Sequence, residues 1–280
     1  MKVLTIGNSF TWSLRSCFPA IAEERGEELQ LQFANFGGCE FRRHWAYITA
    51  EENEPACRMY MDCTMKLRDL LASEPWDIVT IQSASHESWD YANYVPFAGL
   101  IIDYVKKHAP GAKILIQQTW AYREDAPRLE GWGFDRNEMY RRLDEAYRRL
   151  GNEYNLPIIP TGKAVELALA EQPNGKFVNY DPDLLLKLRW PDLPPQAHSL
   201  IGKCFWSKDP ATGELVLRRD TIHLNIRGEY LQACVWYGFI FNKDPRDIQW
   251  VCQVIINGSR TRRSCSPEPA GRYPRGWEER

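Results

Sequence analysis

Short apolar runs alternate along the chain with segments whose apolar residues recur at helical spacing. A short continuous apolar run is typical of a strand buried on both faces, whereas strict alternation is typical of a strand with one exposed face. Leu29, Leu31 and Phe33 alternate with glutamines and predict a half-exposed edge strand. The runs that predict buried strands are Val3–Ile6, Ile78–Ile81, Ile114–Ile116 and Ile158–Ile159.

Between the strands, apolar residues recur at i, i+3, i+4 and i+7, which places them on one face of a helix. Pro110-Gly111 ends one such stripe and Gly151 ends another. Asn225 is the expected N-cap of a closing helix. The stripes are Leu14, Cys17, Phe18, Ile21 and Ala22; Cys63, Leu67, Leu70 and Leu71; Ala98, Ile101, Ile102 and Val105; Met139, Leu143, Ala146, Tyr147 and Leu150; and Ile226, Leu231, Cys234, Val235 and Phe239.

Repeated alternation of strand and helix requires right-handed crossovers and a parallel sheet covered on both faces. We predict an α/β fold: a three-layer α/β/α sandwich with a central, mostly parallel sheet of flavodoxin-like type. Two stretches interrupt this alternation of strands and helices: residues 120–136 and 173–215, which are rich in Pro, Gly and Trp and have weak periodicity. We interpret both as insertions in one domain that spans residues 1–242, followed by a C-terminal extension at 243–280.

Charge and composition exclude several classes of protein. The 35 basic and 37 acidic residues give a formal charge of −2, which argues against nucleic-acid binding through a broad basic field. The 44% hydrophobic and 26% charged contents are those of an ordinary globular protein. No apolar run approaches the roughly 20 residues that span a bilayer. We expect neither a nucleic-acid nor a membrane partner, and the oligomeric state stays open.

A signal peptide at the N-terminus would indicate the cellular compartment. Residues 1–7 are too short for the apolar core of a signal peptide and lack a small-residue cleavage site. We expect a cytoplasmic protein if Met1 is the native start, and a secreted or periplasmic one if a signal peptide was trimmed.

Polar residues follow the predicted strands, and sites in open parallel sheets form at the carboxyl ends of the strands. Gly7, Asn8 and Ser9 follow the first strand. A serine on a tight strand-to-helix turn is exposed and becomes a nucleophile when a base accepts its proton. His223 is the candidate base, and Asp220, three positions earlier, is the candidate group that orients it.

The remaining turns offer donors for the negatively charged oxygen that forms during acyl transfer. The backbone amides of Ser9 and Gly38 are candidates, since glycine lets the backbone approach a substrate closely. Gln82 and His86 follow the run at 78–81, and each carries an N–H donor. For His86 the alternative is a hydrogen bond within its own loop.

In this order the motifs resemble those of the SGNH (GDSL-like) hydrolase family. There a Gly-Asp-Ser-like block after the first strand holds the nucleophile. A glycine after the second strand and an asparagine after the third complete the oxyanion hole, and Asp-x-x-His near the C-terminus completes the triad. The matching residues here are Gly7-Asn8-Ser9-Phe10, then Gly38 or Gly37, then Asp220 and His223. The resemblance runs in order through residues 1–242, and only through these short motifs.

Two positions depart from the family pattern. Asn8 stands where the family usually has aspartate, which is tolerable because this residue is not the nucleophile. Residues 84–87, Ala-Ser-His-Glu, stand where Gly-x-Asn-Asp is expected, so the oxyanion asparagine is absent there. Gln82 or His86 is its candidate replacement.

Aromatic residues gather in the two irregular stretches. Exposed rings beside a site can stack on sugars, so Trp120 is a candidate substrate-binding residue, together with Asn8 and Gly37. The alternative is that the aromatic residues pack these stretches onto the body of the protein. They are Trp120, Tyr122, Trp132, Trp190, Phe205 and Trp206.

These observations predict a serine esterase that acts through an acyl-enzyme. The family resemblance implies small acyl esters as substrates, often acetyl groups on carbohydrates. We expect no metal and no cofactor, because no His, Asp or Glu cluster has metal-ligand spacing and a triad needs none. Two alternatives stay open: a catalytically degenerate carbohydrate-binding module, and an acyltransferase that uses the same triad.

Overall fold

The structure is a computed structural model that describes residues 1–171, 176–248, 251–256 and 259–264, the last two segments as backbone only. Of the expected C-terminal extension at 243–280, residues 249–250, 257–258 and 265–280 lie outside the described residues. In chain order the elements are β1 (Lys2–Gly7), α1 (Ser9–Trp12), α2 (Leu14–Glu24), β2 (Gln30–Asn35), α3 (Phe41–Asn53), α4 (Leu67–Ala72), β3 (Ile78–Ile81), η1 (Tyr91–Asn93), α5 (Phe97–His108), β4 (Lys113–Gln117), α6 (Pro127–Trp132), α7 (Arg136–Tyr154), β5 (Ile158–Ile159), α8 (Thr161–Ala170), α9 (Pro182–Lys187), β6 (Ile201–Lys208), β7 (Leu215–Leu224), α10 (Ile226–Phe241), β8 (Val251–Ile256) and β9 (Ser259–Ser264).

Five parallel strands form the central sheet in the order β2-β1-β3-β4-β5. Val3 of β1 is in register with Ile78 of β3, which is in register with Lys113 of β4. The strand β2 lies at one edge and is half-exposed, as its alternating sequence predicts. The predicted three-layer α/β sandwich with a parallel sheet is therefore confirmed.

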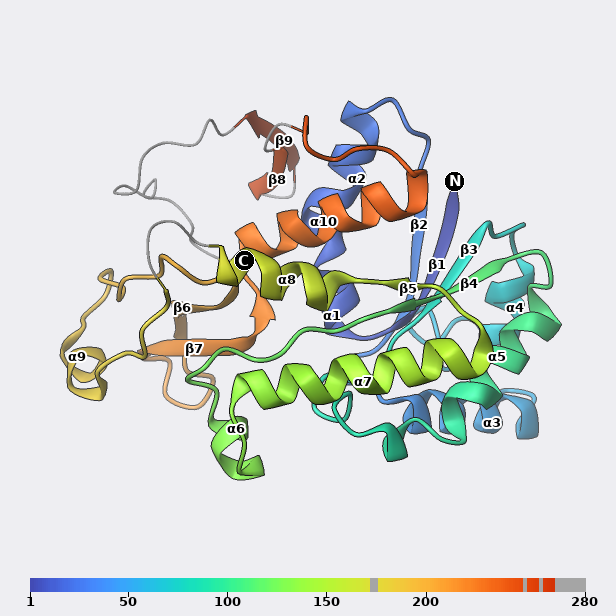
Figure 1. Cartoon of the computed structure of the whole chain (residues 1–280), viewed down its shortest axis with the longest axis horizontal. Coiled ribbons are helices and arrows are strands. Elements are labelled where there is room, and N and C mark those ends of the chain that lie inside the picture. The colour runs from blue at the N-terminus through green and yellow to red at the C-terminus, as the bar shows by residue number, and fades with distance from the viewer. Residues whose placement is uncertain (172–175, 249–250, 257–258, 265–280) are drawn as a thin grey trace.

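Alternate side chains of the strands enter two separate hydrophobic cores. Leu4 and Ile6 of β1 pack with helices α3, α4, α5 and α7, whereas Val3 packs with α2 and α10. Figure 1 shows these two helical layers on opposite sides of the sheet, with α8 between α10 and α7. In the part of the chain that the structure describes, no helix has both the length and the apolarity to cross a membrane.

The strands β6 and β7 form an antiparallel hairpin outside the central sheet. The hairpin lies at one end of the sandwich, with α9 beside it (Figure 1). The prediction that residues 173–215 are irregular is thus wrong for residues 182–187, which form α9, and for residues 201–208, which form β6. Neighbouring residues of a strand point to opposite faces, so the aromatic Phe205 and Trp206 lie on different faces of β6. Their partners in β7 also differ in character, since Phe205 is paired with Arg218 and Trp206 with Leu217. The sequence therefore lacks the alternation that identifies a one-sided strand.

Two helix boundaries differ from the sequence prediction, and one helix was not predicted. Cys63 is exposed in a left-handed turn with a φ of 62°, so its stripe begins instead at Leu67 of α4. Helix α7 continues past Gly151 and ends at Tyr154, with Asn155 as its C-cap. Gly151 serves close packing instead, since a Cβ there would lie 2.9 Å from the Ile158 side chain. The sequence prediction missed α3, whose buried face includes a histidine and a glutamate.

Gly162 of α8 packs directly against the chain that follows β4. A Cβ at this position would lie 2.1 Å from the backbone oxygen of Thr119. We therefore expect Gly162→Ala to lower the free energy of unfolding by about 1–3 kcal/mol through overpacking. The matched control is Gly131→Ala in α6, where the Cβ position is open. It should be neutral or stabilising, because alanine favours helix. Urea unfolding measures both, and equal losses would contradict this packing.

Candidate active site

The turn that follows β1 presents Ser9 at the carboxyl end of the sheet. Asn8 caps the short helix α1 by accepting a hydrogen bond from the amide of Phe10, at 3.1 Å. Gly7 is required before it, since a Cβ there would lie 2.9 Å from Thr11 Oγ1. Ser9 itself is half-buried. Its hydroxyl thus stands at the start of a helix rather than inside the core.

Ser9 is hydrogen-bonded to His223, which is hydrogen-bonded to Asp220, and both of these residues lie near the end of β7. His223 Nε2 lies 2.9 Å from Ser9 Oγ, and His223 Nδ1 lies 2.8 Å from Asp220 Oδ2. The other oxygen of Asp220 accepts the backbone amides of Ile222, at 2.8 Å, and of His223, at 3.0 Å. The structure thus brings together the three residues that the sequence assigns to a triad.

The charge state of Asp220 determines which nitrogen of His223 carries the proton. Burial alone would raise the pKa of this carboxyl, but hydrogen bonds from the His223 ring and from the backbone of residues 222 and 223 lower the pKa to about 2. An ionised carboxylate only accepts hydrogen bonds, so Nδ1 of His223 is the donor to it. Nε2 then directs a lone pair at the Ser9 hydroxyl, which is the arrangement a general base requires.

Helix α10 fixes the base relative to the nucleophile. Asn225 is its N-cap, as the sequence predicts, and accepts the amides of Arg227 and Gly228. Two turns later, Gln232 is fully buried and donates to the backbone oxygen of Phe10 at 3.1 Å. It also accepts from Ser13 Oγ at 2.6 Å. Gln232 is a site residue that sequence reasoning missed, because it lies in an apolar helix without a motif.

Asn8 is not a substrate-binding residue, contrary to the sequence prediction. Its side chain is buried and joins three strand-end turns. The amide nitrogen donates to the backbone oxygens of Cys39, at 3.2 Å, and Ser83, at 3.1 Å. The amide oxygen accepts from Phe10 N and from Gln82 Nε2, the latter at 2.9 Å. All four hydrogen-bonding positions of the amide are therefore occupied.

The prediction that Gln82 contributes to the oxyanion hole is also wrong. Its side chain is fully buried, with Nε2 donating to Asn8 and to the Ser83 backbone oxygen, and Oε1 accepting from Thr11. His86 does not fit that role through Nε2 either, because this nitrogen bonds Glu40 at 3.0 Å. The sequence could not exclude either residue, since burial and partners are not visible in a motif.

Among the described residues, one group could hold a metal ion: ligand atoms of Glu40, His86 and Glu87 lie within 4.8 Å of one another. Arg43 pairs with Glu40 at 3.3 Å, and Arg42 pairs with Glu87 at 3.2 Å. These arginines already balance the two carboxylates. The group is therefore a closed ion-pair network beside the site.

Two backbone amides, those of Ser9 and Gly38, remain as candidate oxyanion donors. Gly38 is exposed, with a φ of 56° that favours glycine, and space is open where its side chain would be. Neither its amide nor that of Ser9 donates to another described residue. The backbone oxygen of the neighbouring Gly37 is engaged by Arg43 at 2.7 Å, and nothing places Gly37 against a substrate.

Trp120 is fully buried and is not available to stack on a ligand, so its assignment as a substrate-binding residue is wrong. Its ring lies parallel to that of Phe10, at 4.1 Å between centroids. Tyr122 is equally buried and bonds Ser85 at 2.9 Å. For these two residues the alternative is confirmed: the aromatic side chains pack residues 120–136 onto the body of the protein.

Another histidine, His44, binds the backbone of the turn that holds Ser9. His44 of α3 is fully buried, with Nε2 3.0 Å from the backbone oxygen of Gly7 and Nδ1 3.1 Å from Tyr60 Oη. A carbonyl oxygen only accepts, so Nε2 carries the proton and Nδ1 accepts from the tyrosine. Burial lowers the pKa of His44 to about 4. No motif surrounds His44 in the sequence, so the sequence did not indicate this role.

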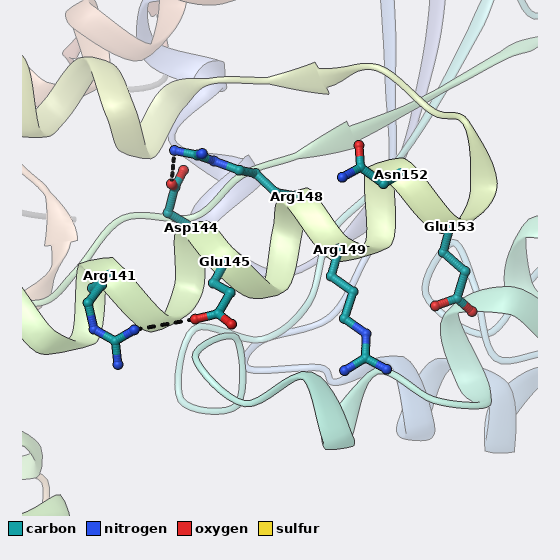
Figure 2. A pocket seen from close by; sticks show the side chains of 7 residues that line it. All are labelled: Arg141, Asp144, Glu145, Arg148, Arg149, Asn152 and Glu153. Carbon is teal, nitrogen blue, oxygen red and sulfur yellow. Dashed lines mark hydrogen bonds and ion pairs between the residues drawn. The ribbon is translucent and has the colours of Figure 1, made fainter.

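The exposed face of α7 contains a shallow hollow that is unrelated to this site. Figure 2 shows that its lining comes from one helix and that arginine and acidic side chains alternate along it. Arg141 pairs with Glu145, and Arg148 pairs with Asp144. Such pairs at helical spacing are solvated and add little stability. No triad residue reaches this hollow.

Comparison with known proteins identifies the family. The model of a domain of unknown function, DUF4886, matches residues 2–175, which is more than half of the chain. The chain belongs to the DUF4886 family. The matched segment holds Ser9, whereas Asp220 and His223 of this DUF4886 protein lie beyond it. No curated protein sequence matches the chain.

Solved structures share the fold of this DUF4886 protein. A DUF4886 protein from Bacteroides uniformis is 22% identical with a TM-score of 0.64, covering 88% of this chain and 85% of its own. A proposed SGNH hydrolase from Slackia heliotrinireducens is 18% identical with a TM-score of 0.55, covering 86% and 98%. An acetyl xylan esterase, AlAXEase, is 16% identical with a TM-score of 0.50, covering 86% and 100%. The fold of the DUF4886 chain is therefore that of the SGNH hydrolases.

Replacing Asn8 by the aspartate usual in SGNH hydrolases should destabilise this DUF4886 protein. A carboxylate cannot donate, so Asn8→Asp leaves the buried oxygens of Cys39 and Ser83 facing a negative charge. We expect a loss of about 2 kcal/mol or more in the free energy of unfolding. Asn152→Asp on the exposed face of α7 is the control, expected to change stability by about 0.5 kcal/mol or less. Urea unfolding at neutral pH distinguishes them, and an Asn8→Asp variant as stable as the control would refute the network.

The pKa of His44 predicts a loss of stability on mild acidification. Unfolded histidine titrates near pH 6.5, so between about pH 6.5 and 4 the unfolded chain binds a proton that folded His44 does not. Stability therefore falls as the pH falls through this window, by about 3 kcal/mol from this group. In His44→Gln this contribution should vanish. Unfolding free energies measured at several pH values test it, and parallel curves for both proteins would contradict it.

Proposed function

We propose that this protein is a serine esterase that hydrolyses small acyl esters, acetyl esters above all. The observation that carries the proposal is the hydrogen-bonded chain from Ser9 Oγ through the His223 ring to an ionised Asp220, with contacts of 2.9 and 2.8 Å. An alcohol hydroxyl becomes a good nucleophile when a neutral, correctly oriented imidazole can accept its proton.

In the first half of the reaction, Ser9 Oγ bonds to the ester carbonyl carbon while its proton passes to His223 Nε2. The carbonyl electron pair moves onto oxygen, where the amides of Ser9 and Gly38 donate hydrogen bonds. Collapse of this intermediate expels the alcohol, which takes the proton from His223. Water then attacks the acyl-enzyme by the same steps and releases the acid. Asp220 stays ionised throughout and stabilises the imidazolium.

Two comparisons support the choice of substrate. The fold is shared with a proposed SGNH hydrolase and with an acetyl xylan esterase, so an acetyl group on a carbohydrate is the ester that we propose to be cleaved. The absence of the oxyanion asparagine after β3 leaves two backbone donors among the residues described, and small, reactive acyl groups are the substrates least dependent on a third.

The alternatives from the sequence predict different products. The argument for a carbohydrate-binding module is weakened for Trp120 and Tyr122, which are buried and cannot stack on a sugar, whereas Trp190 is 52% exposed. An acyltransferase would pass the acyl group from Ser9 to an added sugar alcohol rather than to water. Analysis of the products with a sugar acceptor present distinguishes acyl transfer from hydrolysis.

The proposal predicts that Ser9→Ala and His223→Ala lose hydrolysis of p-nitrophenyl acetate by about 10³-fold or more, with the fold intact. The matched control is Ser73→Ala, which removes a hydroxyl that only caps α4 through the backbone oxygen of Leu70. It should retain the wild-type rate. Initial rates and circular dichroism of all four proteins are the measurements. A Ser9→Ala variant that turns over at a rate near that of the wild type would exclude the mechanism.

A further inference from the structure

Trp120 bridges the two turns that hold the reactive side chains. On one side its ring stacks on Phe10, at 4.1 Å between centroids and 6° between planes. On the other side its indole nitrogen donates to the backbone oxygen of Ile222 at 2.9 Å. Phe10 directly follows Ser9, and Ile222 directly precedes His223. One rigid, fully buried side chain therefore contacts the immediate neighbours of both nucleophile and base.

Strand pairing does not fix the separation of these two turns, which depends on side-chain contacts such as those of Gln232 and Trp120. Ser9 follows a strand of the central sheet, whereas His223 ends a hairpin that shares no strand pairing with that sheet. Phe10 also meets the His223 ring edge-on, at 5.5 Å between centroids. Phe10 thus lies between Trp120 and the base, so the position of Phe10 affects both.

The segment that bears Trp120 is itself anchored to the hairpin. The amide of Arg123 donates to the backbone oxygen of Thr221 at 2.9 Å. The Arg123 guanidinium is buried and is held by Asp125, with contacts of 2.6 and 3.0 Å. The segment after β4 thus binds two consecutive backbone oxygens between Asp220 and His223: that of Thr221 through Arg123 and that of Ile222 through Trp120.

We infer that Trp120 is a positioning residue, which keeps Ser9 Oγ and His223 Nε2 within hydrogen-bonding distance through Phe10 and Ile222. The inference rests on the proposed esterase function. Misplacement of a catalytic group by about 1 Å can cost about 10²-fold in rate. The indole touches no reacting atom, so it affects the chemical step rather than substrate binding.

The test is Trp120→Phe, which keeps a ring against Phe10 and removes only the N–H donor to Ile222. The matched control is Trp76→Phe. Trp76 is 4% exposed and donates in the same way to the backbone oxygen of Leu70, at 3.0 Å. It precedes β3, at the end of the sheet opposite to Ser9. Both variants lose one buried indole bond, so a merely structural role predicts the same kinetics for both.

For Trp120→Phe we expect kcat on p-nitrophenyl acetate to fall about tenfold or more, with KM within about twofold of wild type. Trp76→Phe should match the wild type in both constants. If kcat of Trp120→Phe equals that of the control, or if the loss lies in KM, the inference is overturned.

A second readout does not depend on turnover. The proton between His223 Nδ1 and Asp220 gives a downfield NMR resonance, because the hydrogen bond is charge-assisted, and its loss in His223→Gln assigns it. We expect this resonance to be broadened or shifted in Trp120→Phe and unchanged in Trp76→Phe. An unchanged resonance in both variants refutes the positioning role. If the wild type hydrolyses no ester, the proposed function fails while this resonance still decides the role of Trp120.

Discussion

The side-chain amide of Asn8 is the contact on which the site depends. Three parallel strands end at three separate turns, and backbone pairing within the sheet does not fix how those turns approach one another. Asn8 binds the backbone of the second turn at Cys39 and of the third at Ser83, while it caps the helix of its own. Because two carbonyl oxygens must be satisfied, an amide is required there, and this explains the departure from the aspartate of related hydrolases.

The other half of the site comes from outside the sheet. Asp220 and His223 lie at the end of β7, in a hairpin that the sheet does not pair with. Their position is set by side chains instead: Gln232 from α10 and Trp120 from the chain after β4. Strand order in the parallel sheet thus places Ser9, and side-chain packing brings His223 to it.

The sequence was sufficient to predict the sheet and the grouping of Ser9, Asp220 and His223, because both depend on local signals in a fixed order. Apolar runs marked the strands, and Ser9, Asp220 and His223 occupy short motifs whose places follow from the topology. Asn8 and Trp120 were assigned to substrate binding and Gln82 to the oxyanion hole, although all three side chains are buried among protein groups. Polar or aromatic character at a strand end does not reveal the direction of a side chain. The strand β6 was missed for a related reason, since its pairing partner, not its own pattern, makes it a strand.

Helix α10 follows all five sheet strands in the chain, so the site can be assembled only after this late segment has docked. All five strands of the sheet precede residue 160, yet one face is covered in part by Ala233, Trp236 and Tyr237 of α10, which pack on Val3, Leu115 and Ile159. His223 lies immediately before this helix. A nascent chain that has not yet docked α10 therefore has an exposed apolar face and a serine without a base. Docking of α10 covers this face of the sheet and also holds His223 beside Ser9, so a chain in which α10 is not docked lacks both contacts.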